Sequence, residues 1–475
     1  MRYGLREIPA MLRGPLGSEH ARFALARYGW PLLAPLAAAY RRTLARRTRV
    51  VVVVGSLGKT TTTRATIVAL GGPDRPTPNR NAFSFVDLTV LGIRPGQRHT
   101  VIEVGIGARG QMRVHAGVVR PNVVVVTSIA SDHRPRLGTL EATRHEKADM
   151  VRALSDSGLA VLNGDDEHVR WMATQTRARV VTYGFGEEVD VRASDYTLDW
   201  PHGSRLTLLA RGQRRAVRTR LLGRHQIYPI LAAVAVALEA GVSLDAILSR
   251  LDALAPTPHR LQLAQLPNGA YLVRDEYKAS QETYEAALQL LAEIPAERRL
   301  VLLGEIDSLP DHEAQVYQSL GELIAGLADR AVIVAGQEAS RAYADGACRA
   351  GMPPDALTAL PPSWRQAADV LARELRAGDV ALIKSGPFQR LDRVALSLQG
   401  RKVRCELVVC DAPISGCDGC PMLEQDWEGV SPSGIGENSQ PARRGDGRRP
   451  NPLRIWRRLV SIVLPGRARP SGGEV

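Results

Sequence analysis

Short runs of consecutive apolar residues alternate along the chain with segments that have a helical pattern. The first run, Arg49–Val54, carries five valines in succession. A continuous β-branched run is typical of a strand that is buried on both faces of a parallel sheet. Similar runs follow at 100–104, 122–127, 159–162 and 180–183. The alternation of such strands with helices predicts a doubly wound α/β domain with a parallel sheet at its centre.

A second, smaller α/β unit is predicted downstream. An alanine-rich helical segment at 230–240 ends at Gly241, a plausible helix stop, and the pattern breaks at 255–258. Four more strand-like runs then follow, at 270–274, 299–303, 331–334 and 380–384. We therefore expect a basic N-terminal segment at 1–49, a central domain at 50–256, a Rossmann-like α/β domain at 257–404, a four-cysteine segment at 405–424 and a flexible basic tail at 425–475.

The net charge of +13 is concentrated at the two ends of the 475 residues. Residues 1–49 carry ten arginines against two glutamates, or +8, and residues 440–475 carry nine arginines against two acids, or +7. The remaining residues therefore carry −2. Basic ends on a near-neutral body argue against a nucleic-acid groove. The ends are either solvated tails or segments in peripheral contact with an anionic membrane, since aliphatic residues and Trp456 accompany the arginines.

No apolar run reaches the roughly 20 residues that a membrane-spanning helix needs. The hydrophobic content of 44% is that of a globular protein. We therefore expect a cytoplasmic protein, and any contact with a membrane would be peripheral.

A glycine-containing turn follows the first strand and precedes a helix at 61–70. The turn reads Gly55-Ser-Leu-Gly58-Lys59-Thr60. Backbone N–H groups and a helix N-terminus converge in such a unit, which suits a polyphosphate. Lys59 can reach the β- and γ-phosphates and the Thr60 hydroxyl can bind Mg²⁺. Only two residues separate the glycines, whereas the common phosphate loop has four.

The shortened loop and its threonines, Gly-Ser-Leu-Gly-Lys-Thr-Thr-Thr-Thr at 55–63, resemble the Mur ligase family of amide-bond ligases. Further segments over about residues 50–400 resemble that family's motifs in the same order, and are closest to its D-alanyl-D-alanine-adding members. They are Asn79-Arg-Asn81 with Leu88-Thr89, Glu103-Val-Gly105, Ser131-Asp-His133 with Glu146-Lys147, Leu162-Asn-Gly-Asp-Asp166, Gly223-Arg-His225, His259-Arg260, Asp275-Glu-Tyr277-Lys-Ala279, Val301-Leu-Leu-Gly304 and Leu382-Ile-Lys-Ser385.

The resemblance implies an α/β fold with a central P-loop ATPase domain and an ADP-forming acid–amino-acid ligase, with a role in peptidoglycan or other envelope polymers. A carboxylate attacks the γ-phosphate of ATP, and an amine then attacks the acyl phosphate. The residues implied for the nucleotide are Gly55, Ser56, Gly58, Lys59, Thr60, Thr61, Asn81, His225 and Asp275. Those implied for catalysis are Lys59, His133, Lys147 and Arg260, and those for Mg²⁺ are Thr60, Glu103 and His133.

Several of these residues have both an implied role and a plainer interpretation. Lys147 matches a lysine that is carbamylated in many members, which turns a cation into a carboxylate-like ligand; alone, it reads as a solvated helix lysine. Arg260 would contact the γ-phosphate and Asp275 the ribose hydroxyls, or the two would form an ion pair between domains. Glu103 and His133 would bind a second Mg²⁺, or would be ordinary surface residues at strand ends.

The sequence departs from the family pattern at four places, one of which is Lys384-Ser385-Gly386, where Lys-Gly-Ser is commoner. Only 48 residues precede the first strand, too few for the uridine-nucleotide-binding domain of the D-alanyl-D-alanine-adding members, and in this respect the chain resembles poly-γ-glutamate synthetases. Gln226 and Pro229 replace two asparagines near the adenine. Lys278, Ser280 and Gln281 replace Asn, Asn and Pro in the segment that positions the amine in relatives. We therefore expect small-molecule carboxylate and amine substrates whose identity stays open.

Two other functional classes compete with the ligase. A non-catalytic nucleotide-binding subunit would keep the phosphate loop and act through a partner protein. A general P-loop hydrolase would lack the Rossmann-like domain at 257–404, which carries Arg260 and Asp275. We call this domain the third domain.

Four of the five cysteines fall within one short segment, as Cys405-x4-Cys410-x6-Cys417-x2-Cys420. Four thiolates with one C-x2-C pair can hold a tetrahedral Zn²⁺ ion or an Fe–S cluster, and zinc is the first candidate. The alternative is free cysteines in a flexible tail.

Overall fold

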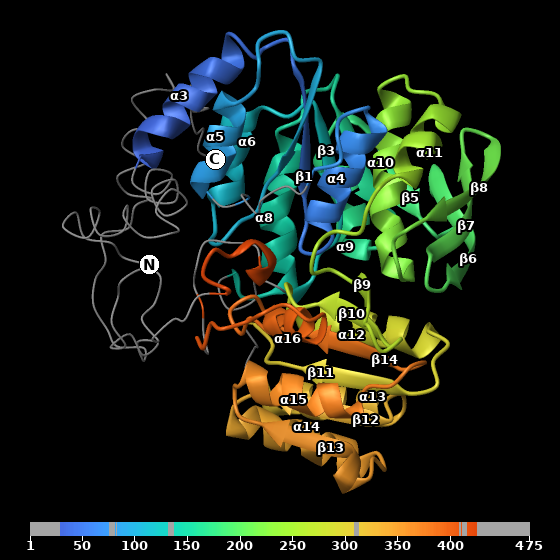
Figure 1. Ribbon diagram of the computed structural model, residues 1–475. Coiled ribbons are helices and arrows are strands. Elements are labelled where there is room, and N and C mark those ends of the chain that lie inside the picture. The colour runs from blue at the N-terminus through green and yellow to red at the C-terminus, as the bar shows by residue number, and fades with distance from the viewer. Residues whose placement is uncertain are drawn as a thin grey trace, which may run out of the picture.

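Figure 1 shows the computed structural model, in which two α/β bodies lie one above the other. The structure describes residues 29–75, 81, 83–131, 137–307, 313–407, 410 and 416–424. The predicted flexible tail at 425–475, which includes Trp456, and residues 1–28 of the N-terminal segment lie outside the described residues. Within the described residues, no helix has the length and apolar character needed to cross a membrane.

The central body is built on an eight-stranded sheet with the order β2-β1-β3-β4-β5-β6-β7-β8. Its first five strands are parallel, and they form where the sequence has its apolar runs: β1 (Arg49–Val54), β2 (His99–Glu103), β3 (Val123–Val126), β4 (Leu159–Asn163) and β5 (Arg179–Gly184). The last three form an antiparallel meander: β6 (Val191–Asp199), β7 (Gly203–Ala210) and β8 (Gln213–Thr219). The apolar-run criterion missed the meander because polar and charged residues alternate with its apolar ones.

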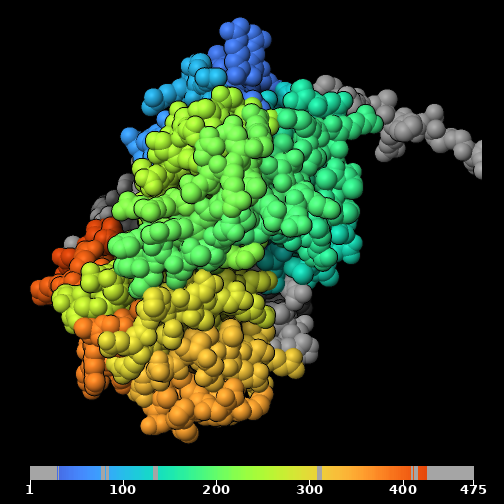
Figure 2. Space-filling view, turned by 90° about the vertical axis from the view of Figure 1, so that its right-hand side faces the viewer, coloured from blue at the N-terminus to red at the C-terminus, as the bar shows by residue number. Residues whose placement is uncertain are grey.

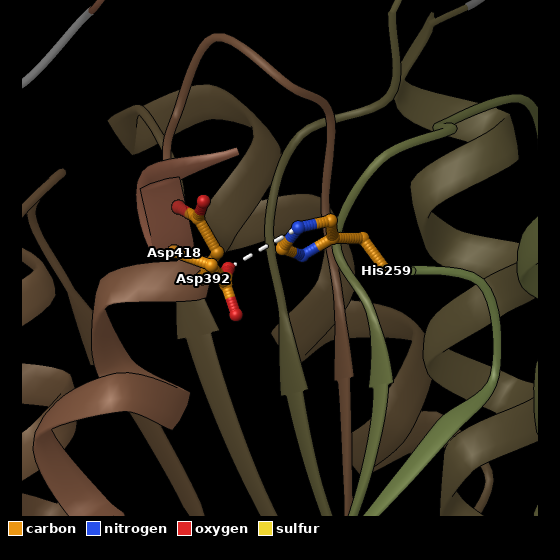
Figure 3. Close-up of side chains that lie close together, drawn as sticks. All are labelled: His259, Asp392 and Asp418. Atoms are coloured by element: carbon orange, nitrogen blue, oxygen red, sulfur yellow. Dashed lines mark ion pairs between the residues drawn. The ribbon is translucent and has the colours of Figure 1, made fainter. Parts of the chain in front are cut away.

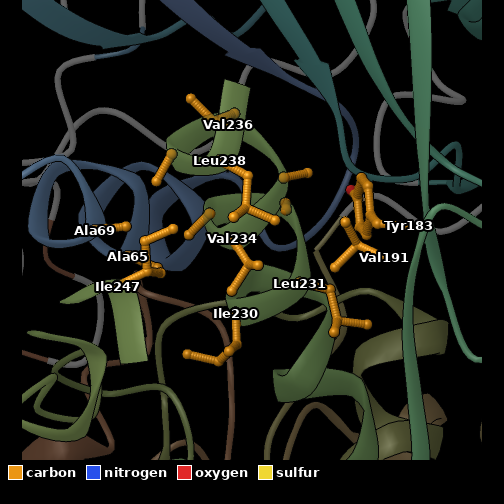
Figure 4. Packing of buried hydrophobic residues seen from close by; sticks show 14 of the residues in the cluster. Ala65, Ala69, Tyr183, Val191, Ile230, Leu231, Val234, Val236, Leu238 and Ile247 are labelled. Atoms are coloured by element: carbon orange, nitrogen blue, oxygen red, sulfur yellow. The ribbon is translucent and has the colours of Figure 1, made fainter. Parts of the chain in front are cut away.

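Helices cover both faces of the central sheet, as expected for a doubly wound fold. One face carries α4 (Lys59–Ala69), α10 (Ile227–Glu239) and α11 (Leu244–Asp252), and Figure 4 shows the packing of α10 against α4. The other face carries α3 (Trp30–Arg42), α5 (Phe83–Leu91), α6 (Gln111–Val119) and α8 (Leu140–Arg152). Val51 and Val53 of β1 face the first layer, whereas Val50, Val52 and Val54 face the second. The valine run is thus buried on both faces, as predicted.

The third domain lies below the central body in Figures 1 and 2. Its six-stranded sheet has the order β13-β12-β11-β14-β10-β9, and only β9 is antiparallel to its neighbour. The strands are β9 (Gln262–Gln265), β10 (Tyr271–Asp275), β11 (Arg299–Leu303), β12 (Arg330–Val334), β13 (Leu357–Leu360) and β14 (Val380–Lys384). One face is covered by α12 (Gln281–Glu293), α13 (Glu313–Ala325) and α14 (Gln337–Arg349), the other by α15 (Trp364–Glu374) and α16 (Asp392–Leu398).

Short helical turns complete the described elements. They are α9 (Glu167–Arg170), η3 (Trp171–Gln175), η4 (Arg224–Gln226), η5 (Pro354–Ala356) and η6 (Cys417–Gly419). The last of these belongs to the cysteine segment, and its Cys417 packs in the core between the sheet and α15–α16 together with Leu423. The chain passes from one sheet to the other between α11 and β9, close to the predicted break at 255–258; the predicted domain limits themselves stay predictions.

Candidate active site

The loop between β1 and α4 is shaped by its two glycines and by the end of β3. Gly58 has a φ of 77° in the left-handed region, and a side chain at Gly55 would overlap the hydroxyl of Thr127. The Thr127 hydroxyl donates to the Leu57 carbonyl at 2.6 Å, and the Ser56 amide donates to the Ser128 carbonyl at 2.7 Å. The loop is therefore held in one conformation, with the N-terminus of α4 behind it.

Lys59 and Thr60, which are predicted to bind the phosphates and Mg²⁺, are the first two residues of α4. Lys59 and Thr60 are buried, and the Lys59 ammonium donates to the Ser56 carbonyl at 2.8 Å. The next hydroxyl, Thr61 Oγ1, lies 3.0 Å from Thr257 Oγ1 in the connection to the third domain. The phosphate loop is thus linked directly to the point where the two domains join.

Lys147 reaches this loop from α8. Its side chain is fully buried, and Nζ donates to Ser56 Oγ at 2.7 Å. The same hydroxyl accepts from the Ala130 amide at 2.8 Å. Lys147 is therefore not the solvated helix lysine of the plainer interpretation, because it contacts the phosphate loop from inside the protein. Its carbamylation stays a prediction.

Glu103 ends β2 on the same side of the sheet. Its Oε1 accepts from Asn81 Nδ2 at 2.7 Å, and the Gly105 amide donates to the Asn81 carbonyl. A carboxylate and a threonine hydroxyl are oxygen donors of the kind that Mg²⁺ prefers, so Glu103 and Thr60 fit the predicted metal. His133 lies outside the described residues, between Ser131 and Leu137.

The third domain brings Arg260 and Asp275 to the opposite wall. Arg260 is half-buried with its guanidinium 5.1 Å from the centre of the Tyr277 ring. Asp275 forms an ion pair of 2.7 Å with Lys384 and accepts from the Leu261 amide. The plainer interpretation, an Arg260–Asp275 ion pair, is wrong: the partner of Asp275 is Lys384. Burial lowers the pKa of Lys384, and Asp275 opposes that shift.

A cavity of about 730 Å³ lies between these two walls. A volume of this size is typical of a cofactor or substrate site. The predicted residues that line it are Ser56, Gly58, Lys59, Thr60, Thr61, Asn81, Glu103, His225, Arg260 and Asp275. Lys147 is not among the lining residues, because it lies behind the loop. The cavity therefore joins the phosphate loop to the third-domain residues in one site.

Tyr228 forms an aromatic end of the cavity that the pattern of apolar runs did not identify. Tyr228 and Phe185 meet edge to face with ring centres 5.3 Å apart, and Arg224 lies over Phe185. The Tyr228 hydroxyl donates to Asp165 Oδ2 at 2.8 Å. Burial lowers the pKa of the neighbouring His225 to about 4, so its ring is neutral at pH 7. Flat apolar surfaces beside hydrogen-bonding groups suit a purine base.

Glu282 is a further cavity residue that sequence reasoning missed. It lies in the first turn of α12, and its Oε1 accepts from the Ser131 amide of the central domain at 2.8 Å. Its Oε2 is buried and has no hydrogen-bond partner in the described part of the chain. The only available signal was its position shortly after the Asp275–Ala279 segment. Glu282 therefore holds the third domain against Ser131, which comes two residues before the predicted Mg²⁺ ligand His133 in the sequence.

The cysteine segment lies at the far side of the third-domain sheet. Cys405, Cys410 and Cys417 are buried, and burial raises the pKa of Cys417 and Cys420. In the part of the chain that the structure describes, only His259, Asp392 and Asp418 place three metal-type donor atoms within 4.8 Å of one another, and no cysteine belongs to that set. The predicted zinc site gains no support from this geometry and stays a prediction.

The His259, Asp392 and Asp418 set, shown in Figure 3, belongs to an ion network. Arg274 donates to both carboxylate oxygens of Asp418, at 3.0 and 3.1 Å, and forms an ion pair with Glu276. His259 lies 3.0 Å from Glu276 and 3.2 Å from Asp418. Burial alone lowers the pKa of His259, but the carboxylates outweigh it and raise that pKa. The network fastens the cysteine segment to the start of the third domain.

Comparisons with known proteins were made once this geometry was in hand. Residues 53–237 match the Mur ligase middle domain, and residues 259–386 match the glutamate ligase domain of Mur ligases. The chain is 30% identical over 366 residues to the UDP-N-acetylmuramoyl-tripeptide–D-alanyl-D-alanine ligase of Mycobacterium tuberculosis, an alignment that covers 73% of this chain and 72% of that protein.

Solved structures of similar fold cover most of the chain. The crystal structure of MurF from Acinetobacter baumannii has a TM-score of 0.69 at 24% identity and covers 78% of this chain and 81% of that one. MurF ligase from Thermotoga maritima in complex with ADP has a TM-score of 0.68 at 21% identity, with coverage of 78% and 83%. At these identities the likeness concerns the fold, and it extends over both sheets.

Proposed function

Because the chain belongs to the Mur ligase family of ATP-dependent ligases, we propose that it joins a carboxylate acceptor to an amino acid or small peptide through an acyl phosphate. The observation that carries this proposal is the cavity between the domains. It brings Lys59 and Glu103 of the central domain to the same space as Arg260 of the third domain. A hydrolase site would not need the second wall.

The two walls have complementary tasks in the proposed reaction. The loop at Gly55–Thr60 binds the β- and γ-phosphates through backbone N–H groups and Lys59. Arg260 stabilises negative charge that develops at the γ-phosphate, and Asp275 accepts hydrogen bonds from the ribose. The aromatic end at Tyr228 holds the base. The nucleotide then spans both domains, so phosphate transfer requires that they are docked.

Magnesium would be held by Thr60 and Glu103, with His133 as a further ligand from the sequence. When bound, it screens the charge between the triphosphate and an approaching carboxylate. Lys147 acts through Ser56: its 2.7 Å hydrogen bond fixes the hydroxyl that also braces the Ala130 backbone. In its unmodified state Lys147 therefore positions the phosphate loop; carbamylation would replace its ammonium group with a carboxylate-like group of the kind that binds a metal.

The substrates are proposed by class. The M. tuberculosis relative is named for a UDP-linked muramoyl tripeptide and D-alanyl-D-alanine, so a peptidoglycan precursor carboxylate and a short peptide amine are the first pair to offer. A second candidate is a ligase of the poly-γ-glutamate synthetase type. A non-catalytic subunit is the third candidate, favoured only by the altered residues Lys278, Ser280 and Gln281.

Coupled ADP release and hydroxylamine trapping test the proposal together. ADP formation should require both a carboxylate and an amine, and hydroxylamine added without the amine should yield the hydroxamate of the carboxylate. ADP release without any carboxylate would indicate a hydrolase. Tight ATP binding with no turnover for any offered pair would indicate the non-catalytic subunit.

A further inference from the structure

Helix α3 and the turn after it expose leucines and arginines on one surface. Among the described residues, five large hydrophobic side chains are exposed, and three of them belong to this segment: Leu32 at 79%, Leu36 at 57% and Leu44 at 62%. Arg42, Arg46 and Arg47 of the same segment are also exposed. We call these six residues the α3 face. Exposed leucines gathered in one short segment are unusual on a protein surface and indicate an interaction.

The orientation of α3 is set by contacts on its other side. Ala34 and Ala37 are buried against the α5–α6 layer. The buried guanidinium of Arg41 donates to the Val119 carbonyl at 2.9 Å and to Asn122 Oδ1 at 2.9 Å. These hydrogen bonds join the helix to the start of β3, so α3 cannot roll to bury its leucines without breaking them.

The segment that carries the α3 face has charges of one sign. The sequence contains no Asp or Glu from residue 20 to residue 73. In Figure 1, α3 lies on the outside of the central body, at the end that is remote from the third domain. A partner that contacts this surface therefore has to accept leucine side chains and supply negative charge at the same time.

We propose that the α3 face binds the surface of a membrane that contains anionic phospholipid. The leucines enter the boundary between head groups and acyl chains, and the arginines contact lipid phosphates. A second copy of the chain fits this surface less well, because a two-fold contact would set the arginines of one copy against those of the other. The proposal does not depend on the proposed ligase reaction.

Sedimentation of the full chain with vesicles tests the proposal. We expect the chain to bind vesicles of phosphatidylcholine that contain roughly 30% phosphatidylglycerol. Binding to vesicles of phosphatidylcholine alone should be weak. Each arginine near an anionic surface contributes on the order of a fivefold change in affinity, so the R42Q/R46Q/R47Q variant should lose about a hundredfold. The L32Q/L36Q/L44Q variant should lose at least about tenfold.

Matched variants separate the α3 face from the overall charge. R177Q/R218Q/R220Q removes three exposed arginines from the central domain, and Leu323→Gln removes an exposed leucine from α13. Both controls should bind vesicles like the wild type, and thermal unfolding should show that every variant is folded. Equal losses for the two arginine triples would overturn the proposal, because charge at any position would then suffice.

Two other results would also overturn it. If L32Q/L36Q/L44Q leaves vesicle binding unchanged but lowers the molar mass in solution, the α3 face contacts a second copy of the chain. If the wild type binds neutral and anionic vesicles equally, the arginines have no role at the lipid surface.

Discussion

The two walls of the cavity are built in different ways. The central domain supplies a continuous segment, Gly55–Thr61, whose conformation follows from two glycines and from Thr127 and Ser128 directly after β3. The third domain supplies separate side chains that are held by partners distant in sequence. Asp275, for example, depends on Lys384, more than a hundred residues away, and Glu282 contacts Ser131 of the other domain.

Because the two walls are built differently, substitutions in them should affect activity and stability in different ways. A substitution in the phosphate loop that keeps the backbone removes a group from the reaction and leaves the fold in place. A substitution in the third-domain wall also leaves a buried partner without its counter-charge, which destabilises the protein. Substitutions in the phosphate loop should therefore lower activity alone, whereas substitutions in the buried ion pair of the third-domain wall should lower stability as well.

The strongest test of this separation is Lys59→Ala. We expect ADP formation to fall by about a thousandfold, because the variant loses the cation at the transferring phosphate. The midpoint of thermal unfolding should stay close to that of the wild type. Lys402→Ala, which removes an exposed lysine, is the control and should retain full activity. Activity of Lys59→Ala within tenfold of the wild type would contradict the assigned role.

Arg260→Ala is expected to have the next largest effect. The guanidinium is half-buried beside Tyr277, and its loss should lower kcat by about a hundredfold through the charge at the γ-phosphate. Steady-state kinetics of ADP release would measure this loss, with Arg218→Ala as the control at an exposed position. A change confined to the KM for ATP would mean that Arg260 only binds the nucleotide.

Lys384→Met should act chiefly on stability. The variant leaves the Asp275 carboxylate buried without its partner, which costs about 3 kcal/mol in the free energy of unfolding. Urea unfolding would measure this loss, and Lys402→Met should show none. The double variant Lys384→Met/Asp275→Asn should recover part of the stability, because the unpaired charge is gone. If the double variant loses the sum of the single losses, the two residues do not interact.

The smallest of the four effects concerns His259 and pH. Its pKa is raised in the folded protein by Glu276 and Asp418, so the protonated ring stabilises the fold. The stabilisation should be complete below the unfolded pKa of about 6.5 and lost as the pH rises through the higher folded pKa. The difference in unfolding free energy between wild type and His259→Gln should shrink over that interval. A difference that grows with pH would contradict the sign.

The structure follows the sequence most closely where neighbouring residues decide the conformation. The valine run at Arg49–Val54 is a strand buried on both faces, and strands lie at each of the other eight predicted runs. The turn from Gly55 to Gly58 requires positive φ at two positions, which glycine adopts freely. The meander β6–β8 was missed, because its alternating polar residues carry no continuous apolar signal.

The sequence by itself determined the phosphate loop, the alternation of strands and helices, and the family, since all three rest on residues close together in the chain. Only the tertiary structure decided which groups meet around the cavity: Asp275 pairs with Lys384 rather than Arg260 within the third domain, Lys147 braces Ser56 within the central domain, and Glu282 reaches Ser131 between the two domains. It also decided that Asp418, between two cysteines, pairs with Arg274. The physical reason is that backbone conformation depends on local residues, whereas contacts between side chains depend on how strands and helices that are distant in the chain pack together.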